Sequence, residues 1–430
     1  MKILMFGWEF PPHITGGLGT ACYGLVRGLL SHNADVTFVV PKVYGDEDKN
    51  IKLANASDVA INVFDKNFEK YHSSFSYLEV NSTLVPYQTP EEYYNIINTE
   101  TENVEESGGS IYSKRYKFSG KYGRNILDEV KRYAMVANEI ARNNDFDVIH
   151  AHDWLTYEAG IEAKKASGKP LVVHMHATEF DRSGENVNQL VYDVERRGME
   201  HADLVVAVSH LTKNIVVERY GIPEEKVVVL HNAVEPVDKM AFANDKKAVK
   251  EKVVTFLGRI TFQKGPDYFV EVAHKVLKKD KNVRFVMAGS GDMMNKIVKR
   301  AAELKIATRF HFTGFLKGED VDRMFAHSDV YVMPSVSEPF GISPLEAMRS
   351  NVPTIISKQS GVSEVLNFAL KCDFWDIDTM ADYIYGLLHY DGISKMFAKN
   401  GKDEVDNLKW ENAAKKLLKQ YSSVLRKVSA

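Results

Sequence analysis

Short runs rich in valine and isoleucine recur along this chain, and segments with helical periodicity separate them. This alternation is typical of parallel sheets covered by helices on both faces, because parallel strands need long crossover connections. A polar stretch at 235–251 divides the runs into two series. The first comprises Lys2–Gly7, Asp35–Val40, Asp147–His150, Leu171–Met175, Leu204–Val208 and Val227–Leu230, and the second Val253–Gly258, Val283–Ala288, Phe310–Thr313, Val330–Met333 and Thr354–Ile356.

The two series predict an α/β protein with two doubly wound, Rossmann-like domains. A chain of 430 residues is long enough for both, and we place the first domain at 1–234 and the second at 235–407. The segment 408–430 has apolar residues at helical spacing, and this helix could return to the first domain. Residues 41–124 interrupt the alternation of strands and helices. This insertion is a lid, a binding loop or a solvent-exposed loop without a function.

Charge and composition exclude several classes of partner. Lysine plus arginine number 55 and aspartate plus glutamate 58, a net charge of −3, so no overall positive field attracts nucleic acid or anionic lipid. Residues 88–113 hold six glutamates and no lysine or arginine, which argues against docking on an anionic membrane. Cys22 and Cys372 are the only cysteines, and no apolar run reaches the roughly 18 residues of a membrane span. We therefore expect a cytoplasmic protein that binds neither nucleic acid nor membrane.

A glycine-rich loop follows the first predicted strand. Gly16, Gly17 and Gly19 precede a helical segment, where glycines let backbone N–H groups approach an anion at a helix N-terminus. Their spacing differs from the G-x-G-x-x-G of dinucleotide-binding proteins, and a plain tight turn is the competing interpretation.

Two cations follow the first strand of the second series. Arg259 and Lys264 lie five positions apart at the end of 253–258. This pair suits a diphosphate, because each cation attracts one phosphate charge by about 4 kcal/mol at 4 Å with an effective dielectric of 20. The pattern indicates a site for a leaving nucleotide, and a solvated basic turn is the alternative.

Two glutamates lie near the start of a predicted helix. Ser343, Pro344 and Glu346 have the spacing of an N-cap, an N1 proline and a capping-box glutamate. Glu346 therefore has a structural role available, and both interpretations stay open for it. Glu338 lies between two turn segments, where a carboxylate can accept hydrogen bonds from sugar or ribose hydroxyls. We predict that Glu338 is functional.

Four histidines lie at the ends of two predicted strands. His150 and His152 alternate on one, and His174 and His176 on the next, so each pair faces one way and a metal site is conceivable. No other His, Cys or carboxylate set at recognisable ligand spacing accompanies them, and we expect no metal.

The residues after His152 suggest a sugar site instead. Asp153 offers a carboxylate and Trp154 an aromatic face, and a saccharide has a polar edge and an apolar face that need both.

Together these motifs resemble the retaining nucleotide-sugar glycosyltransferases of GT-B fold, most closely the glycogen and starch synthase-like members. The likeness runs through nearly the whole chain, and the order of the motifs makes it specific. The motifs are Gly16-Gly17-Leu18-Gly19, His150-Ala151-His152-Asp153-Trp154, His176-Ala177-Thr178-Glu179-Phe180-Asp181, Val208-Ser209, His231-Asn232-Ala233-Val234, Gly258-Arg259, Gln263-Lys264-Gly265, Gly289-Ser290-Gly291, Glu338-Pro339-Phe340-Gly341, Glu346-Ala347 and Ser360-Gly361-Val362-Ser363-Glu364-Val365.

The resemblance implies that the donor lies in a cleft between the domains, mainly on the second. Arg259 and Lys264 would hold the diphosphate and stabilise the departing nucleotide, so that no metal or other cofactor is required. His176 would contact the donor sugar at its reacting face, and Glu338 its hydroxyls. The donor-binding set is completed by Gly16, Gly17, Gly289, Gly291, Phe340, Gly341, Ile342, Ser343 and Glu346, and the acceptor side by His152, Asp153 and Trp154.

The implied activity moves glucose from ADP- or UDP-glucose to the non-reducing end of an α-1,4-glucan. The glycogen and starch synthases carry Lys-x-Gly-Gly at the glycine loop, whereas Ile14 stands at the lysine position here. Hexosyl or mannosyl transfer to a lipid or other saccharide is the alternative, and the segment 178–181 is similar to those broader relatives. A nucleotide-sugar epimerase with the same two-domain architecture and a metal-dependent hydrolase that uses the histidines are alternatives of other classes.

Overall fold

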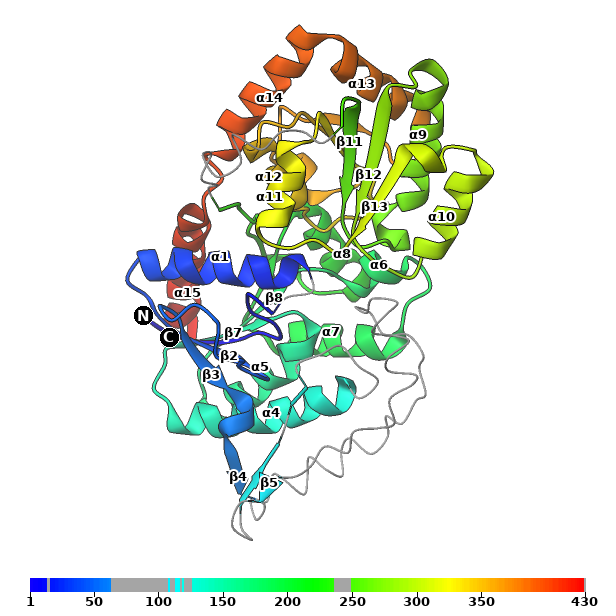
Figure 1. The fold of residues 1–430 in the computed structure, drawn as a ribbon. Coiled ribbons are helices and arrows are strands. Elements are labelled where there is room, and N and C mark those ends of the chain that lie inside the picture. The colour runs from blue at the N-terminus through cyan, green and yellow to red at the C-terminus, as the bar shows by residue number, and fades with distance from the viewer. Residues whose placement is uncertain are drawn as a thin grey trace.

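The computed structural model describes residues 1–13, 16–62, 107–108, 113–116, 118–119, 126–235 and 249–428. Two α/β domains follow one another along the chain (Figure 1), each a parallel sheet between layers of helices. Most of the insertion expected at 41–124, and most of the stretch at 235–251, fall outside the described residues.

The first domain is built on a seven-stranded sheet with the order β10-β9-β8-β7-β1-β2-β3. All of its neighbouring strands pair in parallel. Its strands are β1 (Lys2–Phe6), β2 (Asp35–Val40), β3 (Lys52–Asn55), β7 (Val148–His152), β8 (Leu171–Met175), β9 (Leu204–Ala207) and β10 (Val227–Val229). A separate small antiparallel sheet is formed by β4 (Ala60–Asn62), β5 (Ser107–Gly108) and β6 (Ser113–Arg115).

The second domain has a six-stranded parallel sheet with the order β13-β12-β11-β14-β15-β16. In chain order this is 3-2-1-4-5-6, the Rossmann order, whose strand order reverses beside the first strand and leaves room for a ligand there. Its strands are β11 (Lys252–Leu257), β12 (Val283–Ala288), β13 (Phe310–Gly314), β14 (Val330–Met333), β15 (Thr354–Ser357) and β16 (Leu370–Cys372).

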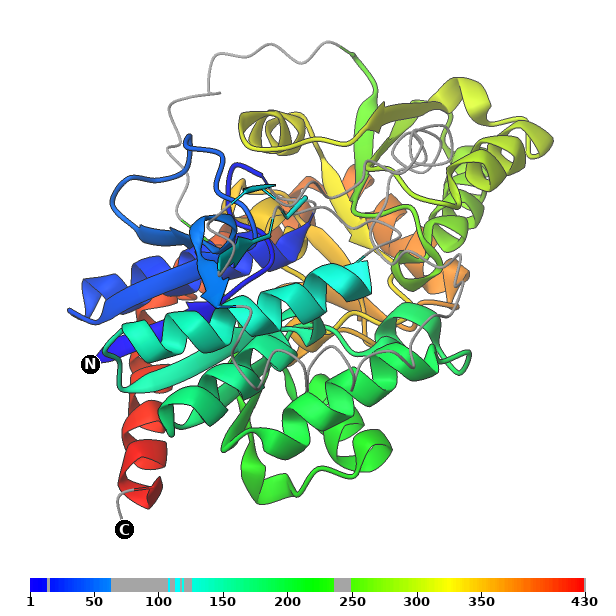
Figure 2. The same cartoon turned by 90° about the horizontal axis from the view of Figure 1, so that it is seen from below.

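Helices cover both faces of each sheet, because alternate strand residues feed two separate cores. Figure 2 shows the helical layer that covers the first sheet from below. The helices of the first domain are α1 (Gly17–Ser31), α4 (Ile126–Asn143), α5 (Trp154–Ser167), α6 (Glu179–Ser183), α7 (Gln189–His201) and α8 (His210–Tyr220). Those that follow are α9 (Pro266–Lys279), α10 (Met294–Glu303), α11 (Glu319–Ala326), α12 (Ser343–Arg349), α13 (Ile377–His389), α14 (Asp391–Val405) and α15 (Trp410–Val428). Short 3-10 turns are η1 (Ala56–Asp58), η2 (Glu224–Lys226), η3 (Phe262–Lys264), η4 (Ala307–Arg309) and η5 (Gly361–Glu364).

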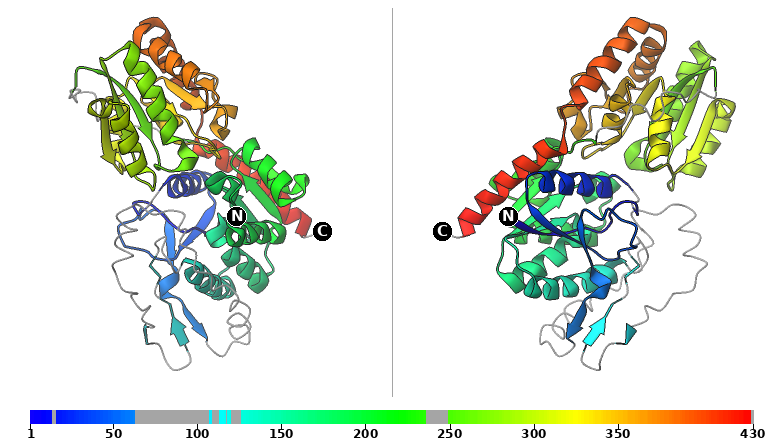
Figure 3. Two further views of the ribbon diagram at one scale, coloured as in Figure 1. Left: turned by 90° about the vertical axis from the view of Figure 1, so that its right-hand side faces the viewer. Right: turned by 60° about the vertical axis from the view of Figure 1, so that its left-hand side comes forward.

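The last helix, α15, leaves the second domain and lies along the first (Figure 3), packed against α1. The contact is close because α1 presents glycines there. A Cβ at Gly24 would lie 2.2 Å from the Trp410 indole, and one at Gly28 would lie 2.5 Å from the Trp410 carbonyl oxygen. Among the described helices, none is long and apolar enough to cross a lipid bilayer.

The fold class expected from the sequence, two Rossmann-like parallel-sheet domains, is confirmed.

Candidate active site

The carboxyl ends of β7 and β8 bring four histidines together. His150 Nε2 lies 3.3 Å from His174 Nδ1, and His152 Nδ1 lies 2.9 Å from His176 Nε2. Strand register places His152 beside His174, and the rings of His174 and His176 stack with centroids 4.2 Å apart. Tyr421 of α15 reaches the cluster, with its hydroxyl 2.6 Å from His150 Nδ1. The alternation visible in the sequence therefore produces one imidazole cluster.

Burial determines the charge of this cluster. His150, His152 and His174 are fully buried, and His176 is partly exposed. Desolvation lowers the pKa of all four imidazoles, and that of His176 falls to about 3. At neutral pH His176 is therefore a neutral hydrogen-bonding group, able to accept or donate but carrying no charge.

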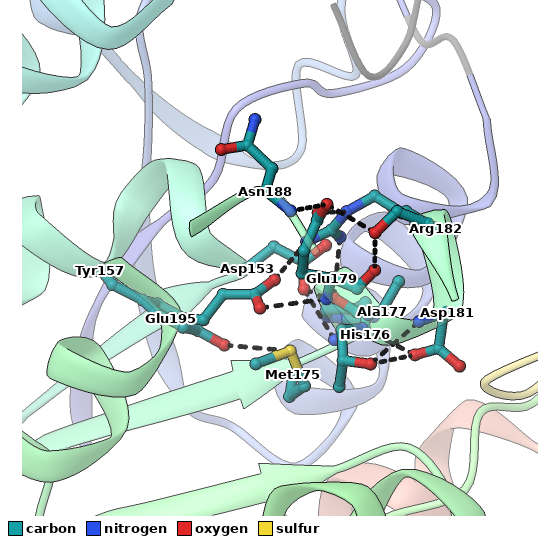
Figure 4. Close-up of polar contacts among 12 residues, drawn as sticks. Asp153, Tyr157, Met175, His176, Ala177, Glu179, Asp181, Arg182, Asn188 and Glu195 are labelled. Carbon is teal, nitrogen blue, oxygen red and sulfur yellow. Dashed lines mark hydrogen bonds and ion pairs between the residues drawn. The ribbon is translucent and has the colours of Figure 1, made fainter. Parts of the chain in front are cut away.

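Asp153 joins β7 to α5 with an unusual backbone. Its φ of 59° and ψ of 170° fall in a region that is essentially restricted to glycine, and strain of this kind is concentrated at functional sites. Its Oδ1 accepts hydrogen bonds from the backbone N–H of His176 at 2.7 Å and of Ala177 at 3.4 Å (Figure 4). Burial raises the pKa of Asp153 to about 6, against the opposing effects of Arg182 and these two N–H groups. Asp153 thus holds the His176 loop in place.

Trp154 was expected to offer a ring face to an acceptor sugar. The structure places it in the core as the first residue of α5, with 1% of its surface exposed. His152 and Asp153 are buried as well. None of the three predicted acceptor-side residues presents its side chain at the surface: His152 ends β7, Trp154 begins α5, and Asp153 lies between them.

A buried ion network lies behind His176, and sequence reasoning missed it. The Arg182 guanidinium is bound to Glu179 Oε2 at 3.0 Å, to Glu195 Oε1, and to the carbonyl of Ala177 at 2.9 Å (Figure 4). Tyr220 donates a hydrogen bond to Glu195, and burial raises the pKa of Glu195 to about 7. The only local signal was the acidic-basic spacing of 179–182, since Glu195 lies on another helix.

The glycine loop lies at the N-terminus of α1, with Gly16 as the N-cap. A Cβ added at Gly16 or Gly17 would meet nothing within 4 Å, so both positions face open space. The buried Glu9 carboxylate already accepts the Gly19 N–H at 3.0 Å, which places a negative charge at this helix terminus. Ile14, at the family's lysine position, lies outside the described residues.

The predicted cations lie at the carboxyl end of β11, the first strand of the second sheet. Lys264 ends η3, and its ammonium is bound to the Glu338 carboxylate in a half-buried ion pair. Arg259 Nη2 donates to Gln263 Oε1 at 3.0 Å. Lys264 and Glu338 therefore meet at the reversal of strand order, and Arg259 lies in the same loop, bonded to Gln263, the residue before Lys264.

Gly289 and Gly291 were expected to contact the donor. The structure gives them a packing role: Cβ atoms there would lie 1.8 Å from the Gly258 carbonyl oxygen and 2.4 Å from that of Ile260. The loops after β11 and β12 can approach one another only because these residues are glycines. Ile260 N–H donates to the Ser290 carbonyl at 2.8 Å across this contact.

The residues around the start of α12 differ from expectation in two respects. Phe340 is only 2% exposed and belongs to a hydrophobic core. The predicted capping box is wrong, because α12 begins at Ser343 with Ile342 as a helical N-cap and without a side-chain cap. Ser343 instead accepts the Tyr331 hydroxyl at 2.8 Å. Burial raises the pKa of Glu346, and its carboxylate has no capping role.

One hydrogen bond connects the two halves of this site. Ser337, beside Glu338, donates to Asp181 Oδ1 in α6 at 2.6 Å. Asp181 also completes a capping box with Thr178. Both residues lie within five positions of His176 along the chain. The Lys264–Glu338 pair and the histidine cluster are thereby held on facing sides of the two domains.

The chain is similar to known glycosyltransferases along most of its length. The family model for glycosyl transferases group 1 matches residues 238–404, and that for glycosyltransferase family 4 matches residues 100–237. An uncharacterized glycosyltransferase of Methanocaldococcus jannaschii is 27% identical, over 98% of each chain. The glycogen synthase of Mycobacterium tuberculosis is 21% identical, over 99% of this chain and 95% of that protein.

Solved structures show the same two-domain arrangement. Sucrose-phosphate synthase from Thermosynechococcus elongatus superposes with a TM-score of 0.72 at 16% identity, over 99% of each chain. HepE of Anabaena, in complex with UDP and glucose, superposes with a TM-score of 0.66 at 17% identity, over 98% of this chain and all of that one. At these identities the likeness shows the fold.

Proposed function

We propose that the chain is a GT-B glycosyltransferase of the group 1 family, and that it moves glucose from ADP- or UDP-glucose to the non-reducing end of an α-1,4-glucan. The transfer retains the anomeric configuration and uses no metal. The donor lies between the Lys264–Glu338 pair and His176, on the facing sides of the two domains.

The observation that carries this proposal is the arrangement of Arg259, Lys264 and Glu338 at the carboxyl end of β11. Lys264 pairs with Glu338 there, and Arg259 lies in the same loop, bonded to Gln263; a diphosphate needs positive charge and a sugar needs a hydrogen-bond acceptor. Glu338 also directs the Lys264 ammonium. A donor phosphate would bind the Lys264 ammonium together with Glu338 or in its place. Glu338 would accept hydrogen bonds from hydroxyls of the hexose.

In the proposed reaction the bond between the anomeric carbon and the diphosphate oxygen breaks, and a bond to the acceptor hydroxyl oxygen forms. The acceptor proton leaves on the departing phosphate. Arg259 and Lys264 stabilise the negative charge that develops on the diphosphate. His176 is neutral, so it orients the hexose by hydrogen bonding without opposing charge on the anomeric carbon. Asp153 acts through the backbone of His176 rather than on a ligand.

Two relatives support the donor and the acceptor class. The glycogen synthase of M. tuberculosis matches almost the full length of this chain, and HepE binds UDP and glucose on the same fold. The substitution of Ile14 for the lysine of the glycogen synthases favours a second candidate, transfer to another saccharide.

One panel of reactions tests the proposal. Purified protein is incubated with UDP-glucose, ADP-glucose or GDP-mannose, each labelled in the hexose, and with glycogen, maltoheptaose, fructose 6-phosphate or a polyprenyl phosphate sugar. We expect label in glycogen and maltoheptaose, released by an exo-acting α-1,4-glucosidase, in the presence of a chelator. Label found only in the other acceptors would replace the glucan assignment, and release of an epimerised donor without acceptor would overturn transfer itself.

A further inference from the structure

A cysteine lies beside two of the histidines. Cys22 is in α1, and its side chain is buried. One potential ligand atom from each of Cys22, His152 and His176 lies within 4.8 Å of the other two. In a tetrahedral zinc site, with bonds of about 2.3 Å to sulfur and 2.0 Å to nitrogen, ligand atoms lie roughly 3.3 to 3.6 Å apart.

We propose that Cys22, His152 and His176 form a site for a divalent cation of the zinc class, and that the bound ion inhibits the enzyme. The donor set is the one such ions prefer, a sulfur and two imidazoles. Residues from three elements meet there: helix α1, the end of β7 and the loop after β8.

One nitrogen of this set lacks a partner. His152 Nε2 is fully buried and has no hydrogen-bond partner in the described part of the chain, whereas buried polar atoms are normally hydrogen-bonded or bound to an ion. The Cys22 thiol loses its proton to solvent as the sulfur–metal bond forms, and no electrons are transferred.

Charge distinguishes this set from the other histidine combination. His150, His152 and His174 also bring ligand atoms within 4.8 Å, but all three are fully buried and neutral. A dication among them would be left uncompensated, which is very costly. The Cys22 set supplies a thiolate.

Two further features favour the Cys22 set. Burial raises the pKa of the Cys22 thiol, and the nearby carboxylates of Glu9 and Asp153 raise it further, so a metal must displace the thiol proton, while the two carboxylates attract the cation. His176 is partly exposed, which provides an entry path and an open fourth position.

Inhibition follows from the second role of His176, and this step rests on the proposed function. A ring nitrogen that binds a metal cannot orient the donor hexose, and the ion would place positive charge where the anomeric carbon becomes electron-poor. Metal and nucleotide sugar should therefore compete.

The test measures binding and inhibition separately. Co²⁺ serves as an optical probe: a thiolate–Co²⁺ charge-transfer band, with intense visible bands of tetrahedral coordination, is expected for the wild type. In Cys22→Ala the charge-transfer band should be absent and the Zn²⁺ dissociation constant, from calorimetry, at least tenfold higher. Cys372→Ala is the matched control, because it removes the other buried free thiol, and it should bind as the wild type does.

Activity gives the second readout. Zn²⁺ should inhibit the wild type and Cys372→Ala, with relief by excess UDP-glucose, and should inhibit Cys22→Ala at least tenfold more weakly at unchanged basal turnover. Cys22→Ser, of nearly the same size, replaces Cys22→Ala if circular dichroism shows a folding defect. Equal Co²⁺ spectra in Cys22→Ala and the wild type would overturn the site. Because the spectra need no turnover, that failure is distinct from a failure of the proposed transferase activity.

Discussion

Lys264 is the residue whose loss should affect turnover most. Its ammonium is bound to Glu338 and is proposed to stabilise the departing diphosphate. We expect Lys264→Ala to lower kcat about 10²- to 10³-fold, as the loss of one preorganised electrostatic contact typically does. Steady-state kinetics with the donor found in the panel measures this. Lys275→Ala, which breaks an exposed ion pair with Asp378, is the control, and unchanged kinetics in Lys264→Ala would remove Lys264 from the site.

Asp153 should make stability depend on pH in a characteristic direction. Burial raises its pKa to about 6, so between pH 4 and 6 the folded chain keeps a proton that the unfolded chain has released. The free energy of unfolding should therefore fall as pH rises, by about 1 kcal/mol between pH 5 and 7.5 from this group. Asp153→Asn removes that contribution and still accepts the His176 N–H. Urea unfolding at both pH values measures the difference, and parallel curves for the two proteins would contradict it.

These residues also show what the sequence could predict at this scale. The order of the motifs, through the resemblance it carries, was sufficient to assign Lys264 and Glu338 to one ligand, and the two side chains pair. The burial of Trp154 and the backbone of Asp153 were not predictable, because the direction of a side chain at a strand-to-helix turn depends on φ and ψ at one residue. Likewise, Glu195 joins Arg182 only through the packing of α7 on α6.

At the scale of elements, replacing glycine by alanine should change the stability of the protein in opposite directions in two helices. In Gly28→Ala the new Cβ meets the Trp410 carbonyl oxygen at 2.5 Å, so α15 must shift, and such overpacking costs about 1–3 kcal/mol. In Gly386→Ala, within α13, the Cβ meets nothing within 4 Å, and the helix gains about 0.5–1 kcal/mol. We expect the thermal midpoint to fall in the first variant and rise in the second. Equal midpoints would mean that α15 does not depend on close contact with α1.

Strands were more predictable than helix ends. The expected runs at 35–40 and 283–288 coincide with β2 and β12, since buried parallel strands are mainly apolar. The strand β16 was missed because its three residues are too few to form a recognisable apolar run. The cap of α12 was wrong because capping depends on the conformation of Ile342, which is already helical, and not on the spacing of Ser343 and Glu346.

At the scale of the whole molecule, Glu364 links the two domains. It lies in η5 of the second domain, and its carboxylate accepts the N–H groups of His210 and Leu211 at 2.9 and 2.8 Å, at the start of α8 in the first domain. The same carboxylate lies 2.9 Å from His231 Nε2. A negative charge at a helix N-terminus is favourable, and each hydrogen bond to a charged group contributes about 1.5 kcal/mol or more. Glu364 is therefore one of the contacts that fix the relative position of the domains, together with Ser337 on Asp181.

Removal of the Glu364 side chain should weaken the contact between the domains, so that their approach depends on the bound donor. We expect Glu364→Ala to have a larger radius of gyration than the wild type by small-angle X-ray scattering, because the N–H groups at the start of α8 lose their partner in the second domain. UDP-glucose, the donor probe, should reduce that radius, since its diphosphate would bind Lys264 while its hexose contacts the first domain. Glu303→Ala, at an exposed helix position, should leave the scattering unchanged. Identical profiles for Glu364→Ala and Glu303→Ala would show that contacts such as Ser337 with Asp181 suffice to hold the domains, and a profile of Glu364→Ala that ignores UDP-glucose would contradict binding of the donor between them.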